Sequence, residues 1–190
     1  MLGTSERENL MGLFDRFKKK DTGAQEEPAA TPAPVTAVAG EDIVCAPVAG
    51  VVIAMSEVPD PVFSTEVLGA GCAVWPEDDT VYAPVGGTVT VKMGHAVGIR
   101  SASGIEVLVH CGIDTVGLDG KGFAGYVEQG DEVAVGQPIL SMDREVVKEA
   151  GLHDCVVLAV SNTAEFSQVK LSVETGSRVD AGVAAIEVVR

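Results

Sequence analysis

Residues 128–139 read EQGDEVAVGQPI, and residues 174–185 repeat the pattern as ETGSRVDAGVAA. A second repeat relates CAPVAGVV at 45–52 to YAPVGGTV at 82–89. In each copy, short apolar runs flank a glycine-containing turn, which is the pattern of two strands joined by a tight turn. Two motifs repeated within one chain indicate duplication of a β-rich unit. We therefore predict an all-β fold, a β sandwich or barrel-sandwich hybrid with internal duplication and minor short helices.

The composition agrees with such a fold and limits the partners. The chain has 190 residues, enough for one domain with a core, and 46% of them are hydrophobic while 4% are aromatic. Helix is expected at one short stretch, DREVVKEA at 143–150. The formal charge of −15 repels phosphates and anionic lipid, so nucleic acid is excluded as a main partner of the folded domain.

Cysteine usage and hydropathy predict a cytoplasmic protein. The four cysteines form no CxxC pair, so they have neither the spacing of a zinc knuckle nor the density of a secreted disulfide scaffold. Reduced thiols are the simpler interpretation. The sequence contains no apolar run long enough to span a bilayer, and its start has no signal-peptide core.

Three regions follow one another along the chain. Residues 1–20 form a tail in which MGLFDRFKKK at 11–20 places apolar residues at helical spacing beside a basic run. This segment is a candidate amphipathic helix for weak contact with a membrane surface, and Met11 is an alternative translation start. Residues 21–40 are rich in Ala and Pro and predict a flexible linker. The folded domain is expected over 41–190.

Two of the three histidines flank one predicted hairpin, HAVGIRSASGIEVLVH at 95–110. A two- or four-residue loop centred on Ala102 and Ser103 pairs His95 with His110 across the strands. Directly opposed residues have Cβ atoms about 4.5–5.5 Å apart, so this register brings both imidazoles together on one face. A loop of odd length shifts the register by one residue and sends the rings to opposite faces.

A pair of imidazoles has three chemical interpretations. A neutral histidine, with an unperturbed pKa of about 6.5, has a free ring nitrogen that can accept a phosphoryl group. The second ring can donate a hydrogen bond to the phosphoryl oxygens, while Val97, Leu108 and Val109 keep water away. The pair can also begin a zinc site, although the sequence shows no third ligand nearby. It can equally be structural, and the residues alone leave the three open.

Longer motifs carry a family resemblance. The string HAVGIRSASGIEVLVHCGIDTVGLDGKGF at 95–123, with VCAPVAGV at 44–51 and SEVPDPVF at 56–63, resembles the glucose-family IIA component of the bacterial phosphoenolpyruvate:sugar phosphotransferase system. MGLFDRF at 11–17 is similar to the start of the free-standing form. The resemblance covers about residues 43–190, and LVHCGIDTV at 108–116 is its most specific block.

This resemblance implies a phosphoryl carrier with the same duplicated β-sandwich fold. It implies that His110 takes the phosphoryl group from the carrier HPr and passes it to a cysteine on the IIB domain of a sugar permease, while His95 stabilises the group. No cofactor is then required. The resemblance also makes His95 and His110 a candidate zinc pair that a partner completes, and it implies that free-standing members can regulate target proteins.

The resemblance also implies a docking surface, an apolar ring with nearby acids that receives HPr. It maps onto Asp60, Val62, Phe63, Leu68, Val91, Leu108, Asp114 and Val116, of which several could instead be core residues. Met93 stands where the family often has Thr, which removes a hydroxyl near the site. His153 lies outside the matching blocks and receives no role.

Other functions share part of this pattern. A biotinyl or lipoyl carrier domain also uses APxxGTV strands and the GDxVxxGQ turn, and its attachment lysine would be Lys92 in VKM at 91–93. We expect Lys92 in mid-strand, where an arm is poorly presented. A zinc peptidase of related architecture needs an HxH motif, which the sequence does not contain. A regulatory binding module that never accepts phosphate is the remaining alternative.

Overall fold

The computed structural model describes residues 31–190. The predicted tail at 1–20, its candidate membrane helix at 11–20 and the first half of the linker lie outside the described residues. Within 31–190, no helix is both long and apolar enough to cross a membrane.

Short strands dominate the chain, as the repeats predict, and helices are few. The strands are β1 (Ile43–Cys45), β2 (Gly50–Ala54), β3 (Ala70–Pro76), β4 (Thr80–Tyr82), β5 (Gly87–Lys92), β6 (Ala96–Ser101), β7 (Glu106–Cys111), β8 (Phe123–Gly125), β9 (Glu132–Val133), β10 (Pro138–Met142), β11 (Val156–Val160), β12 (Gln168–Leu171), β13 (Arg178–Val179) and β14 (Ala184–Val189). The α-helices are α1 (Pro61–Ser64) and α2 (Arg144–Glu149), and the 3-10 turns are η1 (Met55–Glu57), η2 (Thr115–Leu118) and η3 (Thr163–Glu165). The helix predicted at 143–150 is confirmed as α2, with Asp143 as its N-cap.

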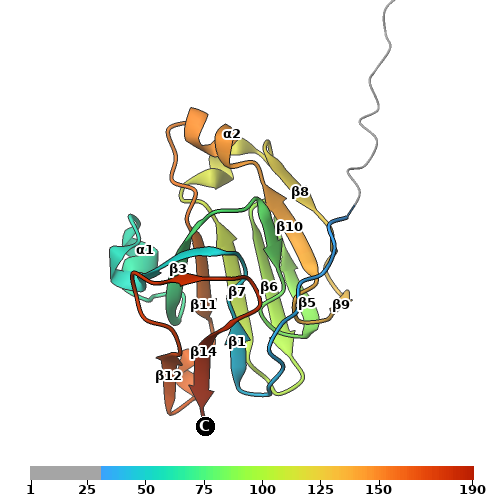
Figure 1. Ribbon diagram of the computed structural model, residues 1–190, viewed down its shortest axis with the longest axis vertical. Helices are drawn as coiled ribbons and strands as arrows, with labels where there is room; N and C mark the ends of the chain where they lie inside the picture. The colour runs from blue at the N-terminus through green and yellow to red at the C-terminus, as the bar shows by residue number, and fades with distance from the viewer. Residues whose placement is uncertain (1–30) are drawn as a thin grey trace, which may run out of the picture. The chain divides into compact units, whose positions relative to one another are not determined.

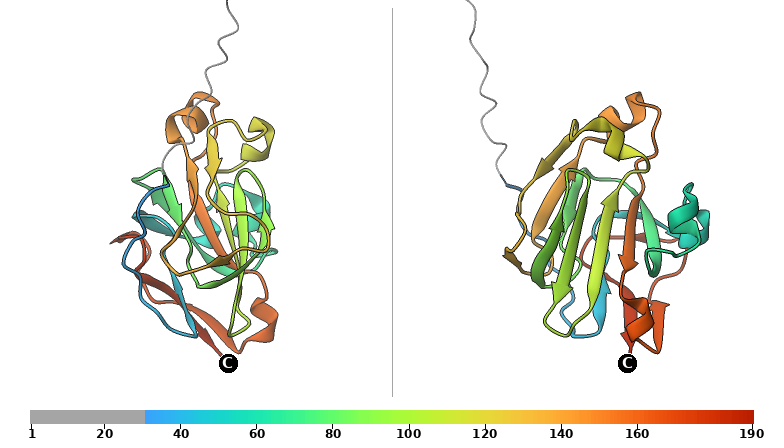
Figure 2. Two further views of the ribbon diagram at one scale, coloured as in Figure 1. Left: turned by 90° about the vertical axis from the view of Figure 1, so that its right-hand side faces the viewer. Right: turned by 180° about the vertical axis from the view of Figure 1, so that it is seen from behind.

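The strands form one large sheet and two small ones. The eight-stranded sheet has the order β13-β2-β3-β11-β7-β6-β5-β9, and the three-stranded sheets have the orders β1-β14-β12 and β4-β10-β8. Figure 1 shows α2 above one end of the strands and α1 at one side, and the right-hand view of Figure 2 shows β5, β6 and β7 lying side by side. The fold is therefore the predicted β-sandwich class with few short helices.

The internal duplication is visible in the strand pairing. The first repeat gives β1–turn–β2 and β4–turn–β5, and the second gives β9–turn–β10 and β13–turn–β14. In the large sheet β2 pairs with β13 at one edge and β5 with β9 at the other, while β1–β14 and β4–β10 form the small sheets. A Cβ on Gly50 or on Gly87 would lie 2.0 or 2.1 Å from a carbonyl oxygen of the neighbouring strand. Both copies thus need glycine at the same place because the backbones approach so closely.

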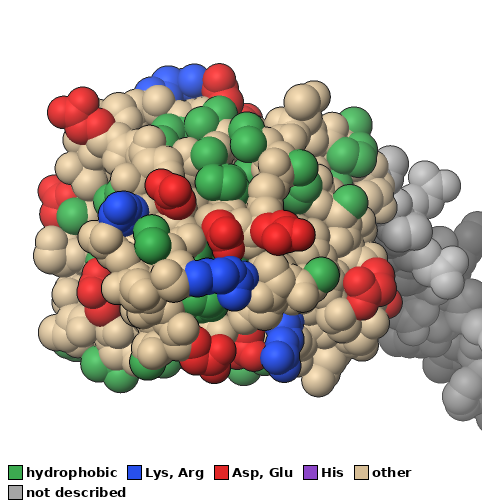
Figure 3. Space-filling view, turned by 90° about the horizontal axis from the view of Figure 1, so that it is seen from below, with side chains coloured by type: hydrophobic (Ala, Val, Ile, Leu, Met, Phe, Trp, Pro, Cys, Tyr) green, Lys and Arg blue, Asp and Glu red, His purple; other side chains and the backbone are tan. Residues whose placement is uncertain are grey.

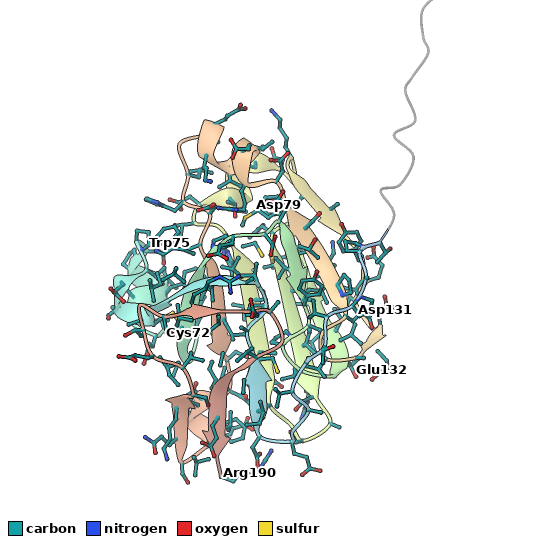
Figure 4. All side chains as sticks on the ribbon, viewed as in Figure 1. Cys72, Trp75, Asp79, Asp131, Glu132 and Arg190 are labelled. Atoms are coloured by element: carbon teal, nitrogen blue, oxygen red, sulfur yellow. The ribbon has the colours of Figure 1, made fainter. Side chains whose placement is uncertain are left out.

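The main core lies between the large sheet and the small sheets. It is built from fully buried valines, isoleucines and leucines, with Ile99, Ile139, Leu140 and Ile186 among the largest. A second, smaller cluster lies on the outer face of the large sheet, under η1 and α1, and contains Phe63, Cys155 and Val157. The side chain of Trp75, which packs against this cluster, lies on the α1 side of the molecule in Figure 4. Asp131 and Glu132 mark the opposite edge at β9, where charges protect an exposed strand edge.

Residues 31–40, which the sequence assigns to the linker, have no regular secondary structure but contact the folded domain. The backbone N–H of Val35 donates to Gly136 O at 3.0 Å, and that of Val38 donates to Gly182 O at 2.9 Å. Gly136 and Gly182 occupy equivalent turns of the second repeat. We call residues 35–38 the strap, because they cross both turns.

Candidate functional site

His110 lies on the outer face of the large sheet, near its centre. Side chains of β7 alternate between half-buried and buried, so Leu108 and His110 face outward while Val107, Val109 and Cys111 face the main core. Across the next strand pair, His110 stands opposite Val157 of β11. The nucleophile candidate is therefore carried by a central strand, which is a rigid part of the fold.

His95 reaches the same place from a turn. Residues 93–95 connect β5 to β6, and Met93 N donates to Ala96 O at 2.8 Å. The two imidazole centroids are 4.8 Å apart with an interplanar angle of 76°. The backbone carbonyl of His95 accepts from Cys111 N at 2.8 Å, which fixes this turn to the end of β7.

The predicted pairing of the two strands is wrong by one residue, although the predicted meeting of the rings is correct. His110 pairs with Ala96, not with His95, and Val97 pairs with Val109, not with Leu108. The loop is odd in length, since Ser101 N donates to Ile105 O. His95 still meets His110 because it precedes β6, so its side chain is not subject to the alternation of strand faces.

Helix α1 brings an aromatic ring against His110. Pro61 at its first position and Asp60 at its N-cap define the start of the helix, and Asp60 Oδ1 accepts from Val62 N at 2.8 Å and Phe63 N at 3.0 Å. The Phe63 ring centroid lies 4.9 Å from that of His110. Phe63 is only 6% exposed, so it packs beneath the site and contributes little surface to the docking ring in which the family resemblance places it.

The turn that follows β7 forms one wall of the site, next to His110. Gly112 has φ +74°, and a Cβ there would lie 2.3 Å from Thr115 Cγ2, so only glycine fits. The buried Thr115 donates from its hydroxyl to Cys111 O at 2.7 Å. Sequence reasoning assigned no role to Thr115, although its place in the specific block at 108–116 was a usable signal.

A shallow hollow of about 220 Å³ opens beside His110 and gathers most of the predicted docking surface. It is lined by Asp60, Val62, Phe63, Leu68, His110, Asp114, Thr115 and Val116. Val91 and Leu108 lie outside the hollow, in one row across β5, β6 and β7, where both stand beside Gly98. Val116 is 68% exposed, and Val62, Leu68 and Val91 are exposed too.

On the face drawn in Figure 3, acidic and basic side chains are interspersed and no histidine is in view, so the histidine pair does not open onto that end of the molecule.

The surroundings keep both histidines neutral. The pKa of His110 is lowered to about 4, chiefly by burial and also by the proximity of His95, while the backbone of Gly112 and the carboxylate of Asp60 act in the opposite direction. Burial also lowers the pKa of His95. His110 Nδ1 is buried and has no hydrogen-bond partner of normal geometry among residues 31–190. Neutral rings keep a nitrogen lone pair for attack on an electrophile.

The cysteines and the potential metal ligands near the histidine pair are the other groups that could react. All four cysteines are free and buried, and burial raises the pKa of Cys72 and Cys155 to about 12, so these thiols stay protonated. The described part of the chain contains no group of three His, Cys, Asp or Glu side chains that could hold a metal ion. A tetrahedral zinc site needs four ligands, and the histidine pair could supply at most two of them.

A family model described as phosphoenolpyruvate-dependent sugar phosphotransferase system, EIIA 1, matches residues 42–166. The chain belongs to this family. Membership is supported by a glucose-specific EIIA component of Oceanobacillus iheyensis, 38% identical over 132 residues that cover 68% of this chain and 80% of that protein. The solved structure of glucose permease IIA from Mycoplasma capricolum matches with a TM-score of 0.65 and 32% identity, covering 76% of this chain and 93% of the other.

Multidomain relatives share the same domain. A beta-glucoside-specific EIIBCA component of Bacillus subtilis is 44% identical over 128 residues, which are 66% of this chain but 21% of that protein. A mannose-specific EIIBCA component of Corynebacterium glutamicum is 42% identical over 135 residues, or 70% of this chain and 20% of that protein. The chain thus spans about a fifth of the length of these relatives.

Proposed function

We propose that this EIIA-family chain is a phosphoryl carrier that accepts a phosphoryl group on His110 and passes it on for sugar uptake. The observation that supports this most directly is a neutral, half-buried imidazole 4.8 Å from a second one, beside a hollow with exposed apolar rims. Such a site can hold a charged group between two rings while a docked protein excludes water.

The attacking atom is assigned by burial. Nδ1 of His110 is sealed from solvent, which leaves Nε2 as the nitrogen that can meet a donor. The Nε2 lone pair attacks phosphorus in line, and the bond from phosphorus to the donor imidazole breaks with its electron pair returning to that ring. The backbone of Gly112 favours the protonated form of His110 and so acts against the effect of burial. No cofactor is needed, because the phosphohistidine donor is itself energy-rich.

We infer the partners from the family and the surface. The donor is HPr, and the acceptor is a cysteine on the IIB domain of a sugar permease. The EIIBCA relatives carry the names beta-glucoside-specific and mannose-specific although their matching regions are similarly close to this chain. The sugar is therefore selected outside the EIIA region, and the exposed ring formed by Val62, Leu68, Val91 and Val116 serves both protein partners in turn.

The carrier proposal is tested by incubating the protein with phosphoenolpyruvate, enzyme I and HPr and measuring an acid-labile mass gain of one phosphoryl group. We expect His110→Gln to abolish labelling. His95→Gln should still be labelled but should transfer onward to IIB more slowly, by about 10²-fold, since a transition-state hydrogen bond is lost. The control is His153→Gln, an exposed histidine outside the pair, which should behave as the wild type. Full labelling of the His110 variant would show that the nucleophile lies elsewhere.

The biotinyl or lipoyl alternative is less compatible with the geometry. Lys92 is the last residue of β5 and not a mid-strand residue as expected, but its ammonium packs so closely on Gly125 that a Cβ there would lie 2.8 Å from Nζ. A modified lysine needs an exposed turn. Intact-mass measurement of the purified protein checks this directly, and a biotin or lipoyl adduct on Lys92 would contradict the carrier proposal.

A further inference from the structure

The turn that carries His95 is braced from behind by a segment distant in sequence. We call residues 120–125 the brace. A Cβ on Gly94 would lie 3.3 Å from Gly120 Cα, so the two backbones are in contact. The ring of His95 meets the ring of Phe123 at a centroid distance of 6.4 Å and an angle of 68°. Three residues in or next to the turn, Lys92, Gly94 and His95, therefore touch the brace.

The brace is fixed by the core and by α2, and not by the histidine pair. Phe123 pairs with Met142 of β10 and packs against the main core. Gly122 O accepts from Asp143 N at 2.7 Å, and a Cβ on Gly122 would lie 2.9 Å from Val146 Cγ1. The position of Phe123 is thus fixed by contacts that do not involve the histidine pair.

The imidazole of His95 depends on packing for its orientation. Its backbone carbonyl accepts a hydrogen bond from Cys111 N, which fixes the backbone of the turn and leaves the rotation of the side chain to its packing contacts. Its two ring neighbours are His110 on one side and Phe123 on the other. Edge-to-face aromatic contacts of this kind have a preferred geometry and stabilise by about 0.5–1.5 kcal/mol.

We propose that Phe123 is the positioning residue that holds the His95 imidazole toward the phosphoryl group on His110. This rests on the proposed carrier function and adds a residue to it. Without the Phe123 ring, His95 keeps its backbone place but can rotate away from the pair. Acceptance of the phosphoryl group by His110 needs only Nε2 of that residue, whereas onward transfer also needs the supporting ring of His95. A loss of positioning should therefore slow onward transfer alone, whereas a general loss of structure should slow both steps.

The test compares Phe123→Leu with a matched control, Phe166→Leu. Phe166 is another half-buried phenylalanine on the main core, next to Arg190 rather than the histidines. We expect Phe123→Leu to be labelled by phospho-HPr within about threefold of wild type and to lose about tenfold in onward transfer to IIB, as expected for a misplaced supporting group. Phe166→Leu should keep both rates.

A double variant tests whether the two residues act together. The combination of Phe123→Leu with His95→Gln should be no slower in onward transfer than His95→Gln alone, because both changes remove the same support. If the leucine variant does not fold, Phe123→Met replaces the ring at closer volume and should show the same split.

A second readout needs no phosphoryl transfer. In the unphosphorylated protein, Phe123→Leu should shift the His95 ring signals in NMR spectra and move the His95 pKa upward, since burial now lowers it. If wild type is never labelled, the carrier proposal fails while this ring test still decides the role of Phe123. Unchanged His95 signals together with an unchanged onward rate in Phe123→Leu would overturn the inference.

Discussion

His110 is neutral because burial disfavours its charged form more than its neighbours favour it. Burial and His95 lower its pKa to about 4, against the opposing effects of Gly112 and Asp60. We predict that the ring carbon signals of His110 titrate well below the ordinary midpoint of about 6.5 in an NMR pH series. Asp60→Asn should lower the midpoint further, because it removes a negative charge. A His110 midpoint at or above 6.5 would contradict the assigned environment.

The same shift links the histidine to folding. Between about pH 6.5 and pH 4 the unfolded chain binds a proton on this residue that the folded chain does not, so this contribution to the free energy of unfolding is complete above 6.5 and falls as pH falls. We predict that His110→Gln flattens this acid limb, by on the order of 2 kcal/mol after allowance for partial exposure. Urea unfolding at pH 7 and pH 4.5 measures it, and an equal loss of stability in both proteins would contradict it.

At the level of single residues, the sequence was a better guide to which side chains carry the chemistry than to how the side chains pack around them. The spacing of His95 and His110 and the block around His110 identified the pair. Burial of Phe63 was not predictable, because a phenylalanine after a helix start packs inward or outward according to the sheet beneath it. The contact between Phe123 and His95 was not predictable from sequence, because the two residues are far apart in the chain and no local pattern connects them.

Among the elements, α1 is short enough to depend on its cap. Four residues make too few internal hydrogen bonds to be stable alone, so Asp60 and the packing of Phe63 hold the helix against the site. We predict that Asp60→Ala lowers the free energy of unfolding by about 1 kcal/mol, whereas Asp60→Asn, which can still cap, lowers it by much less. Chemical denaturation of both variants checks this. Equal losses would show that the carboxylate charge and not the cap is responsible.

The hairpin between β6 and β7 shows where element-level prediction fails. The alternation of residue types predicted both strands, but the turn determines the register, and a three-residue loop centred on Ser103 pairs Ala96 with His110. The functional conclusion survived because His95 lies in the preceding turn. The side chain of a turn residue does not have to follow the alternation of strand faces. A site built from one strand residue and one turn residue can therefore be predicted correctly even when the predicted register is wrong by one residue.

In the whole molecule, the histidine pair marks the place where the duplicated halves differ. The strand order of the large sheet is symmetric about the β11–β7 contact, so β2–β3 in one half corresponds to β5–β6 in the other. The first connection contains η1 and α1 and brings Phe63, and the second is the short turn that brings His95. Both converge on His110 in β7. The repeats in the sequence predicted the duplication, but not that its unequal loops build the site.

The strap joins the two halves, although its Ala/Pro-rich composition predicted only a linker. Its backbone amides bond to Gly136 and Gly182, and a Cβ on Gly182 would lie 2.5 Å from Thr36 O. Gly176 has nearly the same conformation, φ +83° against +85°, but a Cβ there meets nothing within 4 Å.

The two glycines therefore form a matched pair for measuring the strap contact. Alanine at either site bears a similar left-handed backbone strain of about 1–2 kcal/mol, and at Gly182 it must also push the strap away. We predict that Gly182→Ala lowers the melting temperature several degrees more than Gly176→Ala, and that protease cleavage near the strap becomes faster only in the former. Equal melting temperatures and equal cleavage would mean that residues 35–38 do not hold the two turns together.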